Sequence, residues 1–340
     1  MPSSLIIGAG MAGLTAAREL HRYGRDVVVL DKGRGVGGRM ATRRIEQARL
    51  DHGAQYFRAA TPEFQRIVQL LSAENVIAEW PLERTDATGT AFDQPHYIGV
   101  DGMNAVAKAL ARPLTILTGE TVVTFRAEAT GWSVETASGG LYYGDSLLIT
   151  APAPQALTLI EKSVFPLSAA DRSVLSTITY RPCITVLVAL NQPIYLPAPG
   201  VVRPTTGDVA WVADNAQKGI SPNQPSVTIH AGADFSRAHF DDDLTVVGRQ
   251  LIDQLRDWIP ADAIATVEVH RWRYSVAEQR HPDPFLVANT PFPLLFGGDG
   301  FGAGNVEGAF TSGLRMAEFL LKAGDFTEIK ISNDPGKIER

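Results

Sequence analysis

Residues 5–31 read LIIGAGMAGLTAARELHRYGRDVVVLD. The apolar run at 5–7 predicts a β-strand, and the glycine turn at 8–13 leads into a segment whose apolar residues have helical spacing. Gly24 is expected to end that helix, and the next apolar run predicts a second strand that ends at Asp31. The glycines have the G-x-G-x-x-G spacing of a dinucleotide-binding βαβ unit, with Asp31 18 residues after the last of them.

Each part of this pattern has a chemical role in dinucleotide binding. Gly8 permits a sharp turn, Gly10 lets backbone N–H groups approach a pyrophosphate, and Gly13 lets the helix pack on the strand. The helix N-terminus offers unpaired N–H groups to phosphates, and a carboxylate after the second strand accepts hydrogen bonds from ribose hydroxyls. The alternative is that these glycines have a purely structural role in a tight turn. We therefore predict a dinucleotide site formed by Gly8, Gly10, Met11, Ala12, Gly13 and Asp31.

The following loop, KGRGVGGRM at residues 32–40, contains four glycines and three cations. A simple NAD site needs no such loop, so the cations Lys32 and Arg39 suggest contacts with a larger phosphorylated cofactor. A solvated basic loop is the alternative interpretation.

Composition excludes several classes of function. A net charge of −6 over 340 residues gives no indication of a nucleic-acid-binding protein, which needs a clustered basic face. The single cysteine, Cys183, rules out an intramolecular disulfide and fits a reducing compartment. No signal sequence and no apolar run long enough to span a membrane are expected, so the sequence predicts a cytoplasmic protein without membrane or nucleic-acid partners. The histidines have no zinc-ligand spacing, and no metal site is predicted.

The rest of the chain predicts an α/β protein with a second, β-rich part. Thr61 is expected to cap a helix over 62–72, and further helices are expected at 104–111 and 244–258. The acidic run Asp241–Asp243 is expected to supply the N-cap of the helix at 244–258. A hairpin over 132–143 and a strand over 147–150 precede a β-rich region that begins near residue 165. Its predicted strands are 184–190, 209–212, 227–231 and 267–274. A strand at 294–296 then leads through a glycine-rich turn into a last helix.

These patterns predict a Rossmann-like dinucleotide-binding domain with an inserted, mostly antiparallel β-sheet substrate domain. The predicted dinucleotide-binding domain combines residues 1–60, 100–164 and 285–323, and the predicted substrate domain combines residues 61–99 and 165–284. Residues 324–340 are expected to form a polar tail.

The motifs together resemble the renalase family of FAD-dependent oxidases, within the amine-oxidase-like flavoproteins. The resemblance is carried by DK at 31–32, GGRM at 37–40, DHGAQY at 51–56, HRWRY at 270–274 and GGDG at 297–300. It implies non-covalent FAD as the cofactor, because Cys183 lacks the surroundings of a flavin attachment site. The family often has threonine where this chain has Arg58, which places a cation at the expected pocket rim.

The resemblance also implies a set of site residues. Asp31 would bind the adenosine ribose, the 37–39 loop would lie along the pyrophosphate, and the carboxylate of Asp299 would serve the ribityl or pyrophosphate region. The cofactor residues then also include Lys32, Gly38, Arg39, Met40, Gln55, Tyr56, Phe57, Val123, Gly298, Asp299 and Val306. The substrate pocket is expected to be lined by Tyr56, Phe57, Arg58, Tyr97, Ile98, Gly99, Trp272, Tyr274 and Gly300. For Tyr56 and Phe57, and for the 270–274 strand, ordinary core packing is the alternative.

By the same resemblance, the reaction is oxidation of 2- or 6-dihydro isomers of NAD(P)H, with O₂ as the final electron acceptor and H₂O₂ as a product. No catalytic residue is assigned, since such a substrate is already a hydride donor. The alternatives are an amine oxidase or desaturase of the same fold and a flavin-binding sensor without turnover. Amine oxidases of the group often use a lysine near flavin N5, and Lys162 and Lys218 are expected in loops, which disfavours that alternative.

Overall fold

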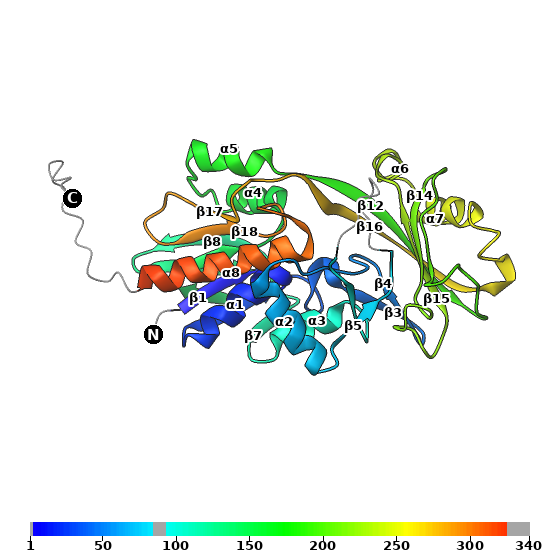
Figure 1. Cartoon of the computed structure of the whole chain (residues 1–340). Helices are drawn as coiled ribbons and strands as arrows, with labels where there is room; N and C mark the ends of the chain where they lie inside the picture. Colours follow the sequence, from blue (N-terminus) through cyan, green and yellow to red (C-terminus); the bar gives the residue numbers. More distant parts are fainter. Residues whose placement is uncertain (1–2, 84–92, 325–340) are drawn as a thin grey trace.

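The computed structural model describes residues 3–83 and 93–324 (Figure 1), so most of the predicted tail lies outside the described part. A six-stranded sheet has the order β17-β18-β11-β1-β2-β7. The five strands β18, β11, β1, β2 and β7 are parallel to one another. The remaining strand, β17, lies at one edge and is antiparallel to β18. The strands are β1 (Ser3–Ile7), β2 (Asp26–Asp31), β7 (Thr115–Thr118), β11 (Ser146–Ile149), β17 (Phe285–Val287) and β18 (Leu294–Gly297).

The predicted βαβ unit is confirmed, with α1 (Met11–Arg22) between β1 and β2. The last helix, α8 (Asn305–Gly324), lies alongside α1 (Figure 1), although almost three hundred residues separate them. A side chain at Gly313 would place its Cβ 2.1 Å from the Ala12 carbonyl oxygen, so glycine is what allows the two helices to approach so closely. The C-terminal segment therefore returns to complete the N-terminal domain.

The helices α2 (Pro62–Ala73) and α3 (Asn104–Ala111) were both expected from the sequence. The prediction that the Thr61 side chain caps α2 is wrong, because its hydroxyl makes no cap bond. Instead it donates to Glu307 in the first turn of α8, at 2.8 Å, and the same carboxylate accepts the Thr61 backbone N–H. A long-range partner has replaced the local cap.

A five-stranded antiparallel sheet forms the second part, in the order β13-β14-β15-β12-β16. The long strands β12 and β16 run from the α/β part to the far end of the molecule (Figure 1). Two helices, α6 and α7, pack on this sheet. The elements are β12 (Thr179–Leu190), β13 (Val201–Val202), β14 (Val209–Asp214), β15 (Ser226–Ala231), β16 (Ile264–Gln279), α6 (Ala233–Ala238) and α7 (Leu244–Asp253).

The helix expected over 244–258 is shorter than predicted and ends at Asp253. Asp243 caps it as expected, by accepting a hydrogen bond from the Thr245 N–H at 2.8 Å. The chain then buries Leu255 and Ile259 through tight turns. Apolar spacing continued past the helix because these turns face the same core.

Three smaller sheets complete the structure. The hairpin of β3 (Thr42–Ile45) and β4 (Ala48–Asp51) packs against the β-rich sheet, with Leu50 beside Leu187. The remaining elements are η1 (Gly38–Met40), β5 (Ile77–Trp80), β6 (His96–Gly99), β8 (Val122–Glu128), β9 (Gly131–Thr136), β10 (Leu141–Gly144), α4 (Ala153–Lys162), α5 (Ala169–Thr177) and η2 (Ala261–Ala263).

The mixed α/β fold class is confirmed, whereas the residue limits of the two domains stay a prediction. Phe64 and Val68 of α2 share an apolar core with Leu14 of α1 and Met316 of α8. Within residues 3–83 and 93–324, no helix is long and apolar enough to cross a membrane.

Candidate functional site

The glycine turn has one face that is closed and one that is open. Gly8 has φ +112°, and a Cβ there would lie 2.5 Å from the Thr150 hydroxyl. A Cβ at Gly13 would lie 1.9 Å from the Gly8 carbonyl oxygen, so these two glycines are required by packing. A Cβ at Gly10 would meet nothing within 4 Å. The turn therefore keeps a bare backbone against open space at the start of α1, which fits the close approach of a pyrophosphate.

Asp31 lies directly beside this turn. Its carboxylate accepts the Ala9 N–H and the Gly33 N–H, each at 2.6 Å. The neighbouring Lys32 is exposed. The acid at the end of β2 is thus held at the mouth of the turn, where the sequence predicts a ribose.

Arg39 and Asp299 form a bidentate ion pair that was not predicted from the sequence. The guanidinium of Arg39, in η1, donates to both carboxylate oxygens of Asp299 at 2.7 and 2.6 Å. It also donates to the backbone carbonyls of Tyr274 and Ser275, at 3.2 and 3.3 Å. Two residues expected at different parts of one cofactor are therefore in contact, and they join η1 to the turn before α8.

The segment 51–56 adjoins the same helical turn. The Ala54 N–H donates to the Arg39 carbonyl at 2.8 Å, and a Cβ at Gly53 would lie 2.0 Å from that oxygen. Gln55 is buried, and its amide N–H group donates to the Asp51 carbonyl at 2.6 Å. The amide oxygen of Gln55 has no hydrogen-bond partner within the described part of the chain.

Aromatic rings from β16 face this segment. The Trp272 ring stacks on His52, with ring centres 5.0 Å apart, and the His270 ring stands edge-on to His52 at 5.1 Å. The indole N–H of Trp272 donates to the His52 carbonyl at 2.8 Å. This arrangement forms a wall of three rings, which we call the ring wall (His52, His270 and Trp272).

The ring wall and its neighbour His230 are electrically neutral near pH 7. Burial, with the nearby His270 and His230, lowers the pKa of His52 to about 3. Burial and the ammonium of Lys218 lower the pKa of His230, on β15, to about 4. Neither His52 nor His230 was predicted from the sequence as a site residue. The position of His52 inside the DHGAQY motif was the one signal available.

Tyr274 lies beyond an irregularity in β16 and does not join the ring wall. The register with β12 shifts between the Cys183–Trp272 pair and the Arg181–Val276 pair. The Tyr274 ring packs against Tyr180, 5.7 Å away. The pairing of β16 with β12 is therefore irregular between Trp272 and Val276, as at a β-bulge, and Tyr274 lies inside this irregular stretch.

Among the other predicted pocket residues, Tyr56 and Tyr97 are half-buried and Phe57 is buried. The Tyr56 ring stands edge-on to His96 at 4.5 Å and lies 5.9 Å from the Trp211 ring. Phe57, only 3% exposed, pairs through its backbone with Tyr97, and its ring packs against Phe64.

The remaining predicted site residues include several that are fixed by packing. Ile98 is 4% exposed, and a Cβ at Gly99 would lie 2.1 Å from the Gly102 carbonyl oxygen. A Cβ at Gly300 would lie 2.5 Å from the Tyr180 hydroxyl. Val123 lies on β8, Met40 is buried at the end of η1, and Arg58 is exposed.

Two residues before and within α8 complete the predicted cofactor set. The Gly298 N–H donates to the Ser312 hydroxyl oxygen at 2.8 Å, which fixes the turn that carries Asp299. Val306 lies in the first turn of α8, half-buried. The N-terminal end of α8 therefore lies next to the Arg39–Asp299 pair, and a helix N-terminus stabilises negative charge.

A model of the flavin containing amine oxidoreductase family matches residues 84–321, and a model of an NAD(P)-binding Rossmann-like domain matches residues 6–72. The chain belongs to the flavin containing amine oxidoreductase family. It is therefore an FAD-dependent oxidoreductase, and the alternative of a flavin sensor without turnover is set aside. The residues present fit FAD, because Asp31 is bonded to the open glycine turn at Ala9, and the loop that carries Arg39 is bonded to the same residue through the Gly37 N–H at 2.8 Å.

Two individual proteins are similar to this chain over very different lengths. Mouse (Mus musculus) renalase is 25% identical over 341 residues, covering 94% of this chain and 99% of renalase. FLOWERING LOCUS D of Arabidopsis thaliana is 44% identical over 52 residues, or 15% of this chain and 7% of that protein.

Solved structures share the fold. A candidate protoporphyrinogen oxidase of Exiguobacterium sp. 255-15 superposes with a TM-score of 0.70 at 12% identity, covering 95% of this chain and 99% of that one. A redesigned putrescine oxidase also has a TM-score of 0.70, at 14% identity, covering 94% of this chain and all of that one. At these identities the likeness establishes the fold alone.

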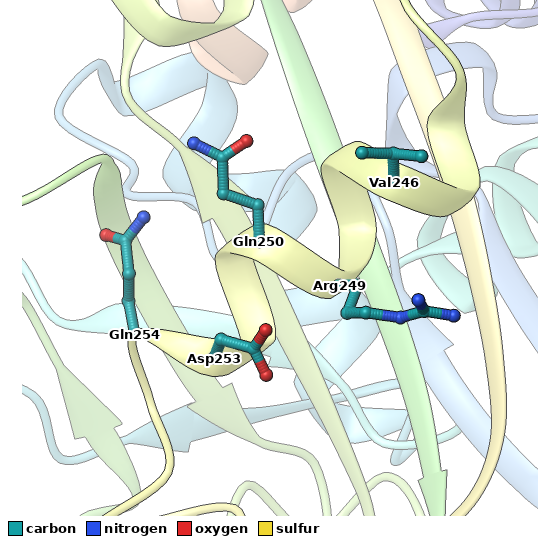
Figure 2. A pocket seen from close by; sticks show the side chains of 5 residues that line it. All are labelled: Val246, Arg249, Gln250, Asp253 and Gln254. Atoms are coloured by element: carbon teal, nitrogen blue, oxygen red, sulfur yellow. The ribbon is translucent and has the colours of Figure 1, made fainter.

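A surface depression of about 440 Å³ lies elsewhere, on the outer side of α7. Figure 2 shows that its lining comes from α7 and from the C-cap residue that follows the helix. The lining residues are Val246, Arg249, Gln250, Asp253 and Gln254. Because α7 lies at the end of the molecule opposite the α/β part (Figure 1), we do not assign it to the flavin site.

We expect FAD to be released intact when the yellow holoprotein is denatured by acid. Burial raises the pKa of the Cys183 thiol, which lowers the fraction of thiolate available to bond a flavin. The measurement is flavin absorbance in the supernatant after precipitation. Flavin that stays with the polypeptide would contradict a non-covalent cofactor.

Proposed function

We propose that the chain oxidises 2- or 6-dihydro isomers of NAD(P)H. FAD, when bound, supplies the hydride acceptor at N5, and O₂ takes the electrons afterwards to give H₂O₂, while NAD(P)⁺ leaves. The observation that carries the proposal is the neutral ring wall beside the segment that contacts Arg39. The full-length similarity to renalase supports it.

An uncharged aromatic wall suits a dihydropyridine ring better than an amine. His52 and Trp272 present stacked rings, and burial keeps the imidazole of His52 uncharged near neutral pH. A dihydropyridine is not aromatic, but it is a nearly planar, conjugated and uncharged ring that can lie against the face of an aromatic side chain. An amine is protonated at neutral pH and needs a group that removes its proton before hydride transfer.

The acids near this wall are already paired. Asp51 accepts from the Lys218 ammonium at 2.7 Å, and Asp299 accepts from Arg39. Each of these two carboxylates is thus already engaged by a cation of the protein. The chain's residues would therefore bind, orient and shield the substrate, which is what a ready hydride donor requires.

The test is anaerobic single-turnover reduction of the bound flavin by each candidate donor at equal concentration. We expect 2- or 6-dihydro-NAD(P) to bleach the flavin within seconds, and NADH and common amines to do so far more slowly. Fast bleaching by a monoamine or polyamine, with none by the dihydronicotinamide isomers, would assign the protein to the amine oxidases.

One observation favours amine oxidation as the second candidate. The expectation that Lys218 and Lys162 are both loop residues is wrong for Lys162, which ends α4, and incomplete for Lys218. Lys218 lies in a turn after β14, yet it is fully buried, with its ammonium 5.0 Å from the centre of the Trp80 ring. Burial lowers the pKa of the Lys218 ammonium, and the paired Asp51 carboxylate opposes that shift.

A further inference from the structure

A buried charge pair joins the two parts of the molecule at the segment 51–56. The Lys218 ammonium and the Asp51 carboxylate are 2.7 Å apart, and both side chains have 0% exposure. Lys218 comes from the turn after β14 in the β-rich sheet, and Asp51 ends β4 of the N-terminal hairpin. Burying two charges is costly, and in some proteins such a pair serves to fix the relative position of the segments that it joins.

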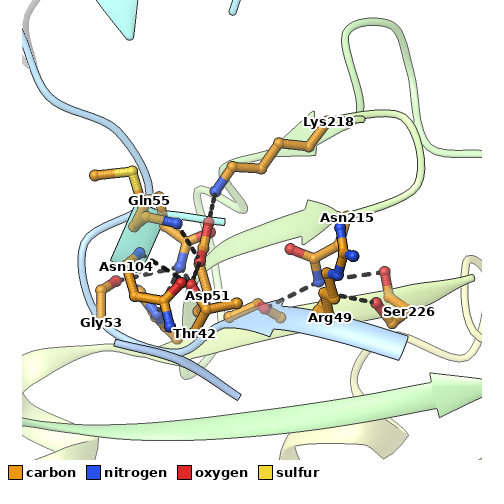
Figure 3. Close-up of polar contacts among 12 residues, drawn as sticks. Thr42, Arg49, Asp51, Gly53, Gln55, Asn104, Asn215, Lys218 and Ser226 are labelled. Atoms are coloured by element: carbon orange, nitrogen blue, oxygen red, sulfur yellow. Dashed lines mark hydrogen bonds and ion pairs between the residues drawn. The ribbon is translucent and has the colours of Figure 1, made fainter. Parts of the chain in front are cut away.

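Asp51 is also the meeting point of two other chain segments. Its second oxygen accepts the Thr42 hydroxyl at 2.6 Å and the Met103 N–H at 2.8 Å. The Asn104 N–H in turn donates to the Thr42 hydroxyl oxygen at 3.1 Å. Figure 3 shows Lys218 reaching down to this carboxylate from the β-rich sheet.

The rest of the segment 51–56 is held by the same sheet. The His52 carbonyl accepts hydrogen bonds from Thr185 on β12 and Trp272 on β16, at 3.2 and 2.8 Å. The Gln55 amide contacts the His230 ring nitrogen on β15 at 3.4 Å. Lys218 supplies the charged member of this set, and the Lys218–Asp51 contact is the one whose loss leaves a buried ion without its partner.

We propose that Lys218 is a positioning residue. Through Asp51 it fixes the segment 51–56, which carries His52 and Tyr56, against the part of the ring wall that β16 supplies. The inference that this governs turnover rests on the proposed function. Within the described part of the chain, Lys218 makes no hydrogen bond to the Gly10 turn or to the Arg39–Asp299 pair, so any effect of Lys218 on the cofactor has to pass through the segment 51–56.

The experiment compares the FAD-loaded wild type with Lys218→Met and with the neutral double variant Lys218→Met/Asp51→Asn. Arg237→Met is the control, because Arg237 also makes ion pairs in the β-rich part, but with the exposed partners Asp234 and Glu278. For each protein we would measure flavin content, thermal midpoint, flavin reduction at saturating 6-dihydro-NAD, and amide hydrogen exchange in residues 51–57.

We expect Lys218→Met to keep its flavin, to be reduced at least tenfold more slowly at saturating donor, and to exchange faster in 51–57. The double variant should recover thermal stability without recovering the rate, because it is neutral but no longer tied to the sheet. Arg237→Met should match the wild type. If Lys218→Met does not fold, the double variant decides the question.

Recovery of the wild-type rate together with the thermal midpoint in the double variant would reduce Lys218 to a stabilising residue and overturn the inference. Unchanged exchange in 51–57 would overturn it as well. If 6-dihydro-NAD does not reduce the wild type, the proposed function fails while hydrogen exchange still tests the positioning role.

Discussion

Replacing Arg39 by alanine is expected to lower the free energy of unfolding by about 3 kcal/mol, because it leaves a buried carboxylate without its cation. The Arg39 and Asp299 side chains are only 27% and 12% exposed, and two short hydrogen bonds join them. We place the loss at the lower end of the range for buried pairs, since Asp299 retains some access to water. Urea unfolding of the FAD-free protein measures it.

The same change is expected to weaken FAD binding roughly tenfold to a hundredfold, the size of one charge-assisted hydrogen bond. Arg39 would act directly on the pyrophosphate or indirectly by orienting Asp299. Titration of the FAD-free variant with FAD gives the dissociation constant. Asp299→Asn, measured alongside, separates the two routes, since it leaves the arginine in place.

Arg43→Ala is the matched control. Arg43 also pairs with an acid, Glu268, at 2.8 Å, but those side chains are 42% and 39% exposed. An exposed pair contributes about 0–1 kcal/mol, and no cofactor role is expected for it. Equal losses of stability and FAD affinity in Arg39→Ala and Arg43→Ala would show that the 37–39 loop does not lie at the cofactor.

Local sequence patterns predicted the elements whose causes are local. The strand–turn–helix–strand unit at 5–31 was predicted because apolar periodicity, Gly8 and Gly13 all act within a few residues of one another. The helix at 104–111 and the Asp243 cap were predicted for the same reason. Where a distant partner competes, local rules gave the wrong result, as Glu307 did for Thr61.

The candidate site was only partly accessible to such reasoning. The FAD motifs identified Asp31, Arg39 and Asp299, yet the direct contact between the last two depends on how α8 returns to α1. Likewise Lys218 looks like an ordinary turn lysine in the sequence. Its burial follows from the packing of the β3–β4 hairpin against the β-rich sheet, which no spacing rule encodes.

Acid is expected to destabilise this protein well before its carboxylates titrate, because of His52 and His230. Their pKa values, about 3 and about 4 in the folded protein, lie far below the ordinary value of 6.5. Between these limits the unfolded chain binds more protons than the folded one, so stability falls as pH drops below 6.5. At pH 5 each histidine contributes a loss of about 2 kcal/mol relative to pH 8, roughly 4 kcal/mol together.

The measurement is urea unfolding at pH 8 and pH 5 with FAD saturating at both. His52→Phe keeps a ring that can stack on Trp272, and His230→Gln keeps a polar group beside Gln55. Each variant is expected to reduce the loss at pH 5 by about half, and the double variant should remove most of it. His21→Gln, at the exposed end of α1, is the control and should leave the loss unchanged. A wild type equally stable at both pH values would mean that these imidazoles are accessible to water, and the neutral ring wall on which the proposed function rests would then lose its physical basis.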